Sequence, residues 1–201
     1  MKETEITVQV FNSLNEIYDI LEKQKFKIVE QYILNDYYFS KFVNQQLNSL
    51  TYPQIIANSF LVREVITENE KKSQLCYKNK TLDDKGNVIA EEKVRTKVQN
   101  LDETLKIFKL AGINRWCSLN QHIICYKKEG FEIMLQIVEG LGVFIEYEED
   151  KSMVGMTEQQ KIEFMFNNLK SIGLKLGKDY SCKKVYMKFM EEQNGVVQKS
   201  I

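Results

Sequence analysis

The sequence predicts an α+β fold built around a closed or nearly closed eight-stranded antiparallel β-barrel with flanking helices. Three observations predict it. About eight short segments are rich in β-branched and aromatic residues. Two tight-turn sequences, DDKGN and KKEG, favour antiparallel hairpins. The sequence also has a weak internal repeat, in which a strand and a helix precede KQKFKIVEQ in the first half and KLAGINRWC in the second. Such a repeat suggests a pseudo-symmetric sheet that closes on itself.

Three segments carry helix signals. The first helix starts at Ser13, which a glutamate follows at the three-residue spacing of a capping box. A second helix is expected from Asp102 as its N-cap to Gly112 as its stop. A third starts at Thr157, with a glutamine at capping-box spacing, and ends before Gly173.

The expected strands are bounded by Gly, Asn, Asp or Lys clusters. They lie at 3–10, 27–39, 59–66, 73–80, 91–99, 120–127, 131–138 and 142–149. The two hairpin turns lie at 83–87 and 127–130. In a barrel of this size the inward face of each strand lines a cavity that is wide enough for one small ligand.

The length and the net charge of the chain limit the number of domains and the kinds of partner that we expect. The 201 residues are expected to form one domain, 1–201, with a C-terminal helical segment at about 181–193. A short amphipathic helix explains the aromatic and basic stretch YSCKKVYMKF more simply than a nucleic-acid contact does. Because 28 basic residues balance 28 acidic ones, no overall field favours nucleic acid or acidic membranes as partners.

Cysteine usage and hydropathy bear on the compartment. Four cysteines without CxxC spacing and a single histidine argue against structural zinc. No stretch approaches the roughly 20 apolar residues that a membrane-spanning helix needs. We expect a cytoplasmic protein with reduced cysteines and no membrane partner.

Carboxylates are paired on two of the expected strands. Glu3 and Glu5 share one face of the first strand, and Glu146 and Glu148 share one face of the last, because side chains alternate along a strand. On an open sheet these acids would face water. Inside a barrel they need a cation or a ligand, and such carboxylates suit Mg²⁺ or Mn²⁺.

Basic side chains lie on other strands and are candidates for phosphate binding. Arg63 lies in FLVREV and Lys78 in LCYKNK, and Lys93, Arg95 and Lys97 share one face of EEKVRTKV. The alternative for that row is a solvated sheet face. Cations and acids in one cavity would together suit a polyphosphate with its divalent metal.

Several catalytic motifs are absent from the sequence. It has no GxxxxGK[ST], no GxGxxG after a strand, no GxSxG and no HExxH. Nucleotide binding through a P-loop and zinc-dependent proteolysis are therefore not expected.

The order of the segments carries a family resemblance. The ExE strand, NDYYF, LVREV, YK and IVEGLGVFIEYE follow one another over roughly residues 3–182. This order resembles the CYTH or triphosphate-tunnel superfamily, which includes class IV adenylyl cyclases, thiamine triphosphatases and inorganic triphosphatases. The most specific stretch is MLQIVEGLGVFIEYE. The resemblance implies that the barrel is a tunnel in which acids carry Mg²⁺ or Mn²⁺ and basic residues bind a triphosphate.

Individual residues match the family's motif. Glu3 and Glu5 match its opening acidic pair, and Glu146 matches the acid of its late strand, so the resemblance implies catalytic metal ligands at these positions. Arg63 matches the second arginine of its Leu-Arg-x-Arg strand, and Lys78 matches its Lys-Gly-Pro lysine. Both are implied to hold phosphate oxygens.

Other positions depart from the motif. Thr7, Leu61, Gln121, Ile123 and Gln136 stand where the family has charged residues. Their loss removes charge-assisted contacts of about 1.5–3 kcal/mol each. The row 93–97 is the candidate to compensate for the missing cations, and Glu148 or Glu149 is the candidate for an additional metal ligand.

Two functions follow as expectations. The first is metal-dependent binding and conversion of a nucleoside triphosphate, thiamine triphosphate or tripolyphosphate in the tunnel, by a triphosphatase or an adenylyl cyclase. The second is a catalytically eroded binding protein for a phosphorylated ligand or a protein partner, because removing charges of both signs leaves no uncompensated buried charge. The resemblance also suggests a homodimer.

Overall fold

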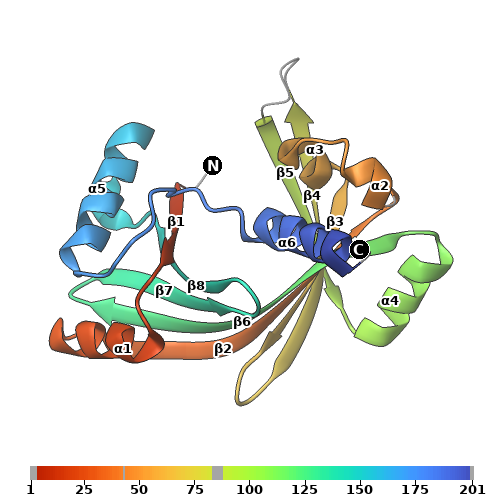
Figure 1. Ribbon diagram of the computed structural model, residues 1–201. Coiled ribbons are helices and arrows are strands. Elements are labelled where there is room, and N and C mark those ends of the chain that lie inside the picture. The colour runs from red at the N-terminus through yellow and green to blue at the C-terminus, as the bar shows by residue number, and fades with distance from the viewer. Residues whose placement is uncertain (1–3, 43, 83–87, 200–201) are drawn as a thin grey trace. The chain divides into compact units, whose positions relative to one another are not determined.

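The computed structural model describes residues 4–42, 44–82 and 88–199. The chain divides into two compact units. The first unit comprises Met1–Tyr32 and Gln121–Lys184, and the second comprises Ile33–Asn120 and Val185–Ile201. Strands β2 (Lys27–Ser40) and β6 (Asn114–Lys128) contribute residues to both units (Figure 1).

The strands form an eight-stranded antiparallel sheet with the order β1-β8-β7-β6-β2-β3-β4-β5. The other strands are β1 (Glu5–Val10), β3 (Ser59–Ile66), β4 (Lys71–Leu82), β5 (Val88–Val98), β7 (Phe131–Val138) and β8 (Gly142–Glu148). The predicted α+β class and antiparallel strands are confirmed. Each expected strand has a counterpart, although β6 begins six residues before the predicted start at Asn120.

The predicted closure of the barrel is not found in strand pairing among the described residues. The sheet order has β1 at one end and β5 at the other. The outer edge of β1 is instead bonded to the chain segment 175–182, which we call the edge segment. The Thr7 N–H donates to the Tyr180 carbonyl at 2.9 Å, and the Cys182 N–H donates to the Thr7 carbonyl at 3.1 Å. These backbone groups of β1 are therefore already satisfied without another strand.

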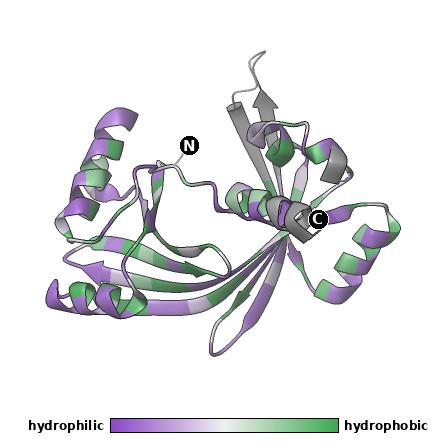
Figure 2. Ribbon diagram, in the orientation of Figure 1, coloured by the Kyte–Doolittle hydropathy of each residue, from purple (hydrophilic) through white to green (hydrophobic). Residues whose placement is uncertain are grey.

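Two helices and a short 3₁₀ turn belong to the first unit: α1 (Leu14–Lys23), α5 (Glu158–Ser171) and η1 (Lys151–Met153). The predicted capping boxes at Ser13 and Thr157 are confirmed. Both helices bury apolar side chains in one core with the sheet, including Leu21 of α1 and Leu169 of α5. Hydrophilic and hydrophobic residues accordingly alternate along both ribbons in Figure 2.

The second unit contains α2 (Asn44–Leu47), α3 (Tyr52–Ala57) and α4 (Leu101–Leu110), together with most of α6 (Lys184–Lys199). Helix α4 begins two residues earlier than predicted. Its N-cap is Asn100 rather than Asp102, because the Asn100 side chain accepts a hydrogen bond from the Glu103 N–H at 3.1 Å. Phe108 of α4 packs against Phe39 and Phe60 of the sheet.

One of the two predicted turns, and the predicted C-terminal helix, can be compared with the structure. The turn KKEG connects β6 and β7, and Glu129 and Gly130 have the positive φ angles of a two-residue hairpin loop. The turn DDKGN lies outside the described residues. Helix α6 overlaps the helical segment expected at 181–193 but begins and ends later. Within the described residues, no helix has the length and apolarity needed to cross a membrane.

Candidate functional site

The candidate site lies on one face of the first unit's sheet. Strand β1 buries its even-numbered side chains in the core and places Glu5 and Thr7 on the opposite face. The antiparallel register pairs Glu5 with Glu148 and Thr7 with Glu146 on β8. Because paired residues project to the same side of a sheet, the predicted acids of two distant sequence segments meet here. We call this side the polar face.

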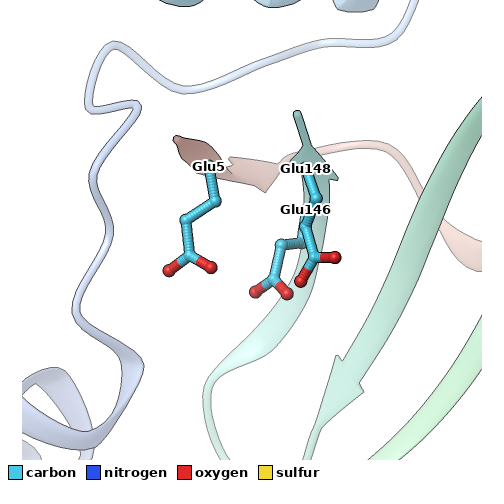
Figure 3. Close-up of side chains that lie close together, drawn as sticks. All are labelled: Glu5, Glu146 and Glu148. Carbon is cyan, nitrogen blue, oxygen red and sulfur yellow. The ribbon is translucent and has the colours of Figure 1, made fainter. Parts of the chain in front are cut away.

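Three carboxylates gather on the polar face. One carboxylate oxygen each from Glu5, Glu146 and Glu148 lies within 4.8 Å of the other two. Figure 3 shows the side chains leaving β1 and β8 toward a shared region. We call these three residues the acidic cluster. Three like charges this close repel one another, and oxygen ligands in this number suit Mg²⁺ or Mn²⁺. The residues present therefore fit a hard divalent cation.

Glu146 is held in place by its neighbours. Its Oε2 accepts a hydrogen bond from Thr7 Oγ1 at 3.3 Å and another from Gln136 Nε2 at 3.0 Å. Lys184 Nζ lies 3.6 Å from the same oxygen. Since Thr7 and Gln136 are buried, these bonds fix the orientation of the Glu146 carboxylate on the polar face.

Four of the positions that depart from the family motif, Thr7, Gln121, Ile123 and Gln136, lie on the polar face, and Thr7 and Gln136 contact Glu146. Gln136 is opposite Ile123 on β6 in the register, and Gln121 lies two residues earlier on the same face of that strand. Gln121 is 3% exposed, and its side-chain oxygen accepts no hydrogen bond from the described residues. Uncharged side chains therefore line this part of the face.

A cysteine also lies on this side of β6. Burial raises the pKa of the Cys125 thiol to about 11, with smaller contributions from the nearby Glu30 and Glu132 carboxylates. The thiol is protonated at neutral pH, so it does not supply a thiolate nucleophile.

Two other acids of the sequence prediction, Glu3 and Glu149, are not part of the described acidic cluster. Glu3 lies outside the described residues. Glu149 turns away from the cluster: its Oε1 is 2.6 Å from Lys161 Nζ, and its Oε2 accepts the Thr4 N–H at 3.0 Å. The bond from Lys161, followed by the bond from the Thr4 backbone, lowers the pKa of Glu149. Of the two candidates for an additional ligand, the structure brings Glu148 to the cluster and Glu149 to a salt bridge.

In the second unit, Arg63 is engaged by a partner that sequence reasoning missed. Its Nε and Nη2 donate to the two carboxylate oxygens of Asp36, both at 2.7 Å. Asp36 lies directly opposite on β2, and its side chain is 2% exposed. The signal was available in NDYYF, since a charged residue inside a strand requires a partner when it is buried.

The other predicted cations follow β4 and β5. The register pairs Lys78 with Lys93, Cys76 with Arg95 and Gln74 with Lys97. Arg95 and Lys97 are exposed. The described side chains do not include those of Lys78 and Lys93. By alternation, Arg95 and Lys97 lie on the face of the sheet that also carries Arg63 and the buried Leu61, since Arg63 pairs with Gln74 and Leu61 with Cys76.

Comparison with known proteins relates this arrangement to a family. No family model matches the chain. A candidate adenylate cyclase of Methanocaldococcus jannaschii is 27% identical over 191 residues, which cover 93% of this chain and 97% of that protein.

Solved structures share the fold. A protein of Pyrococcus horikoshii OT3 is 19% identical, with a TM-score of 0.62 and coverage of 96% of this chain and 99% of that one. A candidate adenylyl cyclase from Hippeastrum, described as having a dominant triphosphatase activity, is 14% identical, with a TM-score of 0.56 and coverage of 95% and 96%. The chain is thus similar over nearly its whole length to a candidate adenylate cyclase, and it shares its fold with the structure of a candidate adenylyl cyclase.

Proposed function

We propose that this protein binds a triphosphate-containing small molecule together with Mg²⁺ or Mn²⁺ and hydrolyses it as a triphosphatase. The observation that carries the proposal is the acidic cluster, in which oxygens from two neighbouring strands lie within 4.8 Å of one another. The similarity of the chain to candidate adenylate cyclases, one of which is described as having a dominant triphosphatase activity, supports a triphosphate as the ligand. The closed tunnel of the family, formed by a single domain 1–201, is part of this proposal.

Each part of the polar face has a role in the proposed reaction. Glu5, Glu146 and Glu148 would hold the divalent ion, and Glu3 is the proposed fourth acid. The bound ion would polarise the phosphate oxygens and lower the pKa of a coordinated water. Thr7 and Gln136 keep the Glu146 carboxylate directed at the ion through the hydrogen bonds they donate.

The proposed phosphate contacts come from the basic residues of the second unit. Lys78, Lys93, Arg95 and Lys97 would hold phosphate oxygens, whereas the guanidinium of Arg63 is already bonded to Asp36. Phosphate oxygens accept charge-assisted hydrogen bonds from ammonium and guanidinium groups, which orient the ligand for attack. The exposed side chains of Arg95 and Lys97 are accessible to such a ligand.

Cyclisation of ATP to cyclic AMP is the competing reaction. It requires the ribose hydroxyl to be held in line with the α-phosphate, whereas hydrolysis requires only a water. The names of the relatives favour a cyclase, and the activity described for the Hippeastrum protein favours a triphosphatase. Product analysis distinguishes them.

A second candidate function is that of a binding protein without catalytic activity. The observation that favours it is the uncharged lining of the polar face, in which Gln121, Ile123 and Gln136 replace charged residues of the family motif. The bidentate bond of Arg63 to Asp36 points the same way, because the guanidinium already has an anionic partner.

The decisive experiment measures phosphate release from ATP, thiamine triphosphate and tripolyphosphate, in Mg²⁺ and then in Mn²⁺, with cyclic AMP followed in parallel. Glu5→Gln/Glu146→Gln is the blank, and circular dichroism shows whether each sample is folded. Phosphate release that the double variant lacks supports the triphosphatase. Cyclic AMP without phosphate release identifies a cyclase instead. A folded wild-type protein without turnover overturns the enzymatic proposal and leaves the binding protein.

A further inference from the structure

Two neighbouring strands of the first unit separate at one end of the sheet. The register between β7 and β8 ends at the pair of Met134 with Glu146. Strand β7 nevertheless begins earlier, at Phe131, and β8 continues to Glu148. Over this length β7 stays paired with β6 as far as Phe131, and β8 stays paired with β1 as far as Glu148. The two strands therefore part from each other in the interior of the sheet.

A cavity of about 680 Å³ lies where these strands part. Its lining comes from the β6–β7 hairpin, from the chain that runs from β8 to η1, and from α5. All of these residues belong to the first unit. Sites for small organic ligands typically measure about 300–1,000 Å³, so this space is large enough for such a molecule. We call it the β7–β8 cavity.

Three aromatic side chains line the β7–β8 cavity. The rings of Phe131 and Tyr147 are in contact, with centroids 4.7 Å apart. Tyr147 is 2% exposed, and its hydroxyl donates to Asp150 Oδ2 at 3.3 Å. Phe164 of α5 packs against the same core and supplies the third ring. Because these rings are held by their packing, they offer a firm apolar surface to a ligand.

The charged residues of the cavity are mostly acidic. Two lysines line it together with five acids: Glu129, Glu132, Glu148, Glu149 and Asp150. At neutral pH these groups sum to −3, and the bond of Lys161 to Glu149 at 2.6 Å reduces the sum to −2. Such a lining repels a phosphate group and attracts a cation.

The rings and the carboxylates together select a class of ligand. A cation is attracted to the face of an aromatic ring, and carboxylates nearby add to that attraction. A neutral aromatic molecule would gain only the ring contacts, and an inorganic ion would leave the rings without an apolar partner. We propose that the β7–β8 cavity binds an organic cation that carries an aromatic ring.

This cation has two possible sources, the organic group of the triphosphate ligand or a separate small molecule. Glu148 lines the cavity and also belongs to the acidic cluster. A phosphate ester whose cationic ring lies in the cavity would therefore have its phosphates beside the proposed metal site. Only this first source rests on the proposed function, because the cavity needs neither metal nor phosphate to hold a cation.

The test is a ligand-observed NMR titration of the full chain with benzyltrimethylammonium, without metal or phosphate. N-benzylacetamide, which has the same ring but no charge, is the reference ligand. We expect the cation to bind about tenfold more tightly than the neutral ligand, and Phe164→Leu and Glu132→Gln each to weaken its binding about three- to fivefold. The matched control is Glu163→Gln on α5, since Glu163 is exposed, accepts a hydrogen bond from Gln159 and does not line the cavity. It should bind the cation within about twofold of wild type.

A second titration separates the cavity from the acidic cluster. Glu5→Gln/Glu146→Gln removes two carboxylates of the cluster that do not line the cavity, so it should bind benzyltrimethylammonium within about threefold of wild type. Loss of binding in this double variant would mean that the cation binds at the cluster and would overturn the proposal.

Competition in the presence of Mn²⁺ distinguishes the two sources of the cation. Thiamine triphosphate carries a positively charged thiazolium ring, whereas tripolyphosphate has no organic group. Displacement of benzyltrimethylammonium by thiamine triphosphate alone supports the organic group of the triphosphate as the cation. Displacement by neither supports a separate small molecule. Displacement by tripolyphosphate as well would place phosphate in the cavity and contradict the proposal.

The remaining outcomes decide the inference independently of catalysis. Equal affinity of wild type for the charged and the neutral ligand, or no binding of either, overturns it. A preference for the cation that is unchanged in both Phe164→Leu and Glu132→Gln overturns it as well. If Phe164→Leu does not fold, Glu132→Gln decides alone, since the Glu132 side chain is 48% exposed and its replacement leaves the core intact. Phosphate release is not measured in these titrations, so the cavity and the proposed function fail separately.

Discussion

The two units of the chain differ in how their charged residues are arranged and paired. In the first unit, one oxygen from each of three carboxylates lies within 4.8 Å of the other two, and Lys184 contacts one of these carboxylates. In the second unit, the guanidinium of Arg63 and the carboxylate of Asp36 match one to one through two bonds of 2.7 Å. Breaking a buried ion pair leaves an uncompensated charge, whereas carboxylates that lie this close together repel one another unless a cation binds between them. The comparison is therefore consistent with the proposed metal site in the first unit and with a structural pairing of Arg63.

The largest expected effect tests the structural side of this comparison. Arg63→Met leaves the Asp36 carboxylate, which is 2% exposed, without its partner. Loss of one partner from a fully buried pair costs about 3–5 kcal/mol, and because Arg63 is 35% exposed we expect a smaller loss of about 2–3 kcal/mol in the free energy of unfolding. Urea unfolding followed by fluorescence of Trp116, the only tryptophan, measures it in the same unit.

The double variant Asp36→Asn/Arg63→Met is the control for that loss. It removes both charges, so it should be more stable than Arg63→Met alone. A single variant that unfolds at the wild-type urea concentration would mean that Arg63 is not a structural partner and would return it to the set of phosphate ligands.

The next effect concerns the difference between an acid of the cluster and an exposed acid elsewhere in the first unit. Glu148→Gln should weaken Mn²⁺ binding by about tenfold to a hundredfold, because it removes one of three oxygens that lie within 4.8 Å of one another. Glu22→Gln, an exposed acid of α1, is the matched control and should bind like wild type. Titration calorimetry gives both dissociation constants, and equal values for the two variants would remove Glu148 from the metal site.

A smaller effect is expected at the exposed basic row of β5. If Arg95 compensates for the missing cations, Arg95→Ala should weaken tripolyphosphate binding about tenfold, the scale of one lost charge-assisted contact. Arg115→Ala is the matched control, since Arg115 is an exposed arginine of β6 in the same unit and outside the basic row of β5. Unchanged binding in Arg95→Ala would contradict compensation by this row.

The smallest effect concerns the salt bridge of Glu149. Its bonds to Lys161 and to the Thr4 backbone lower its pKa in the folded state. A lowered pKa in the folded state stabilises the fold above the pKa of the unfolded chain, and the stabilisation is lost as the pH falls through the folded value. Glu149→Gln should therefore melt below wild type at pH 7 and together with it in strong acid. A difference in melting temperature that persists in strong acid would contradict this origin.

Sequence rules predicted helix starts and strand positions well where nearby residues determine them. Capping-box spacing located the starts of α1 and α5, and segments rich in β-branched and aromatic residues between turn-forming clusters located the strands. The helices α2 and α3 were missed, although Thr51 and Gln54 form the same capping box in TYPQ. The start of α4 was misplaced because Asn100 and Asp102 are both good N-caps, and the choice depends on how Leu101 and Phe108 pack.

Long-range features of the site were less accessible to sequence reasoning. Alternation placed Glu146 and Glu148 on one face, but the register that brings Glu5 beside them is set by the pairing of β1 with β8. The bond of Asp36 to Arg63 depends on the register of β2 and β3 in the same way. The predicted closure is not found in the strand pairing of the described residues, and no sequence pattern indicated that the edge segment would occupy the outer edge of β1.

The most direct test of the metal site is the amount of Mn²⁺ that the protein binds, counted by electron paramagnetic resonance of the free ion in wild type, Glu5→Gln/Glu146→Gln and Glu22→Gln. We expect wild type and Glu22→Gln to bind Mn²⁺ with equal affinity, and the double variant to lose this binding while it remains folded. A double variant that binds Mn²⁺ as tightly as wild type would contradict the assignment of the acidic cluster as the metal site.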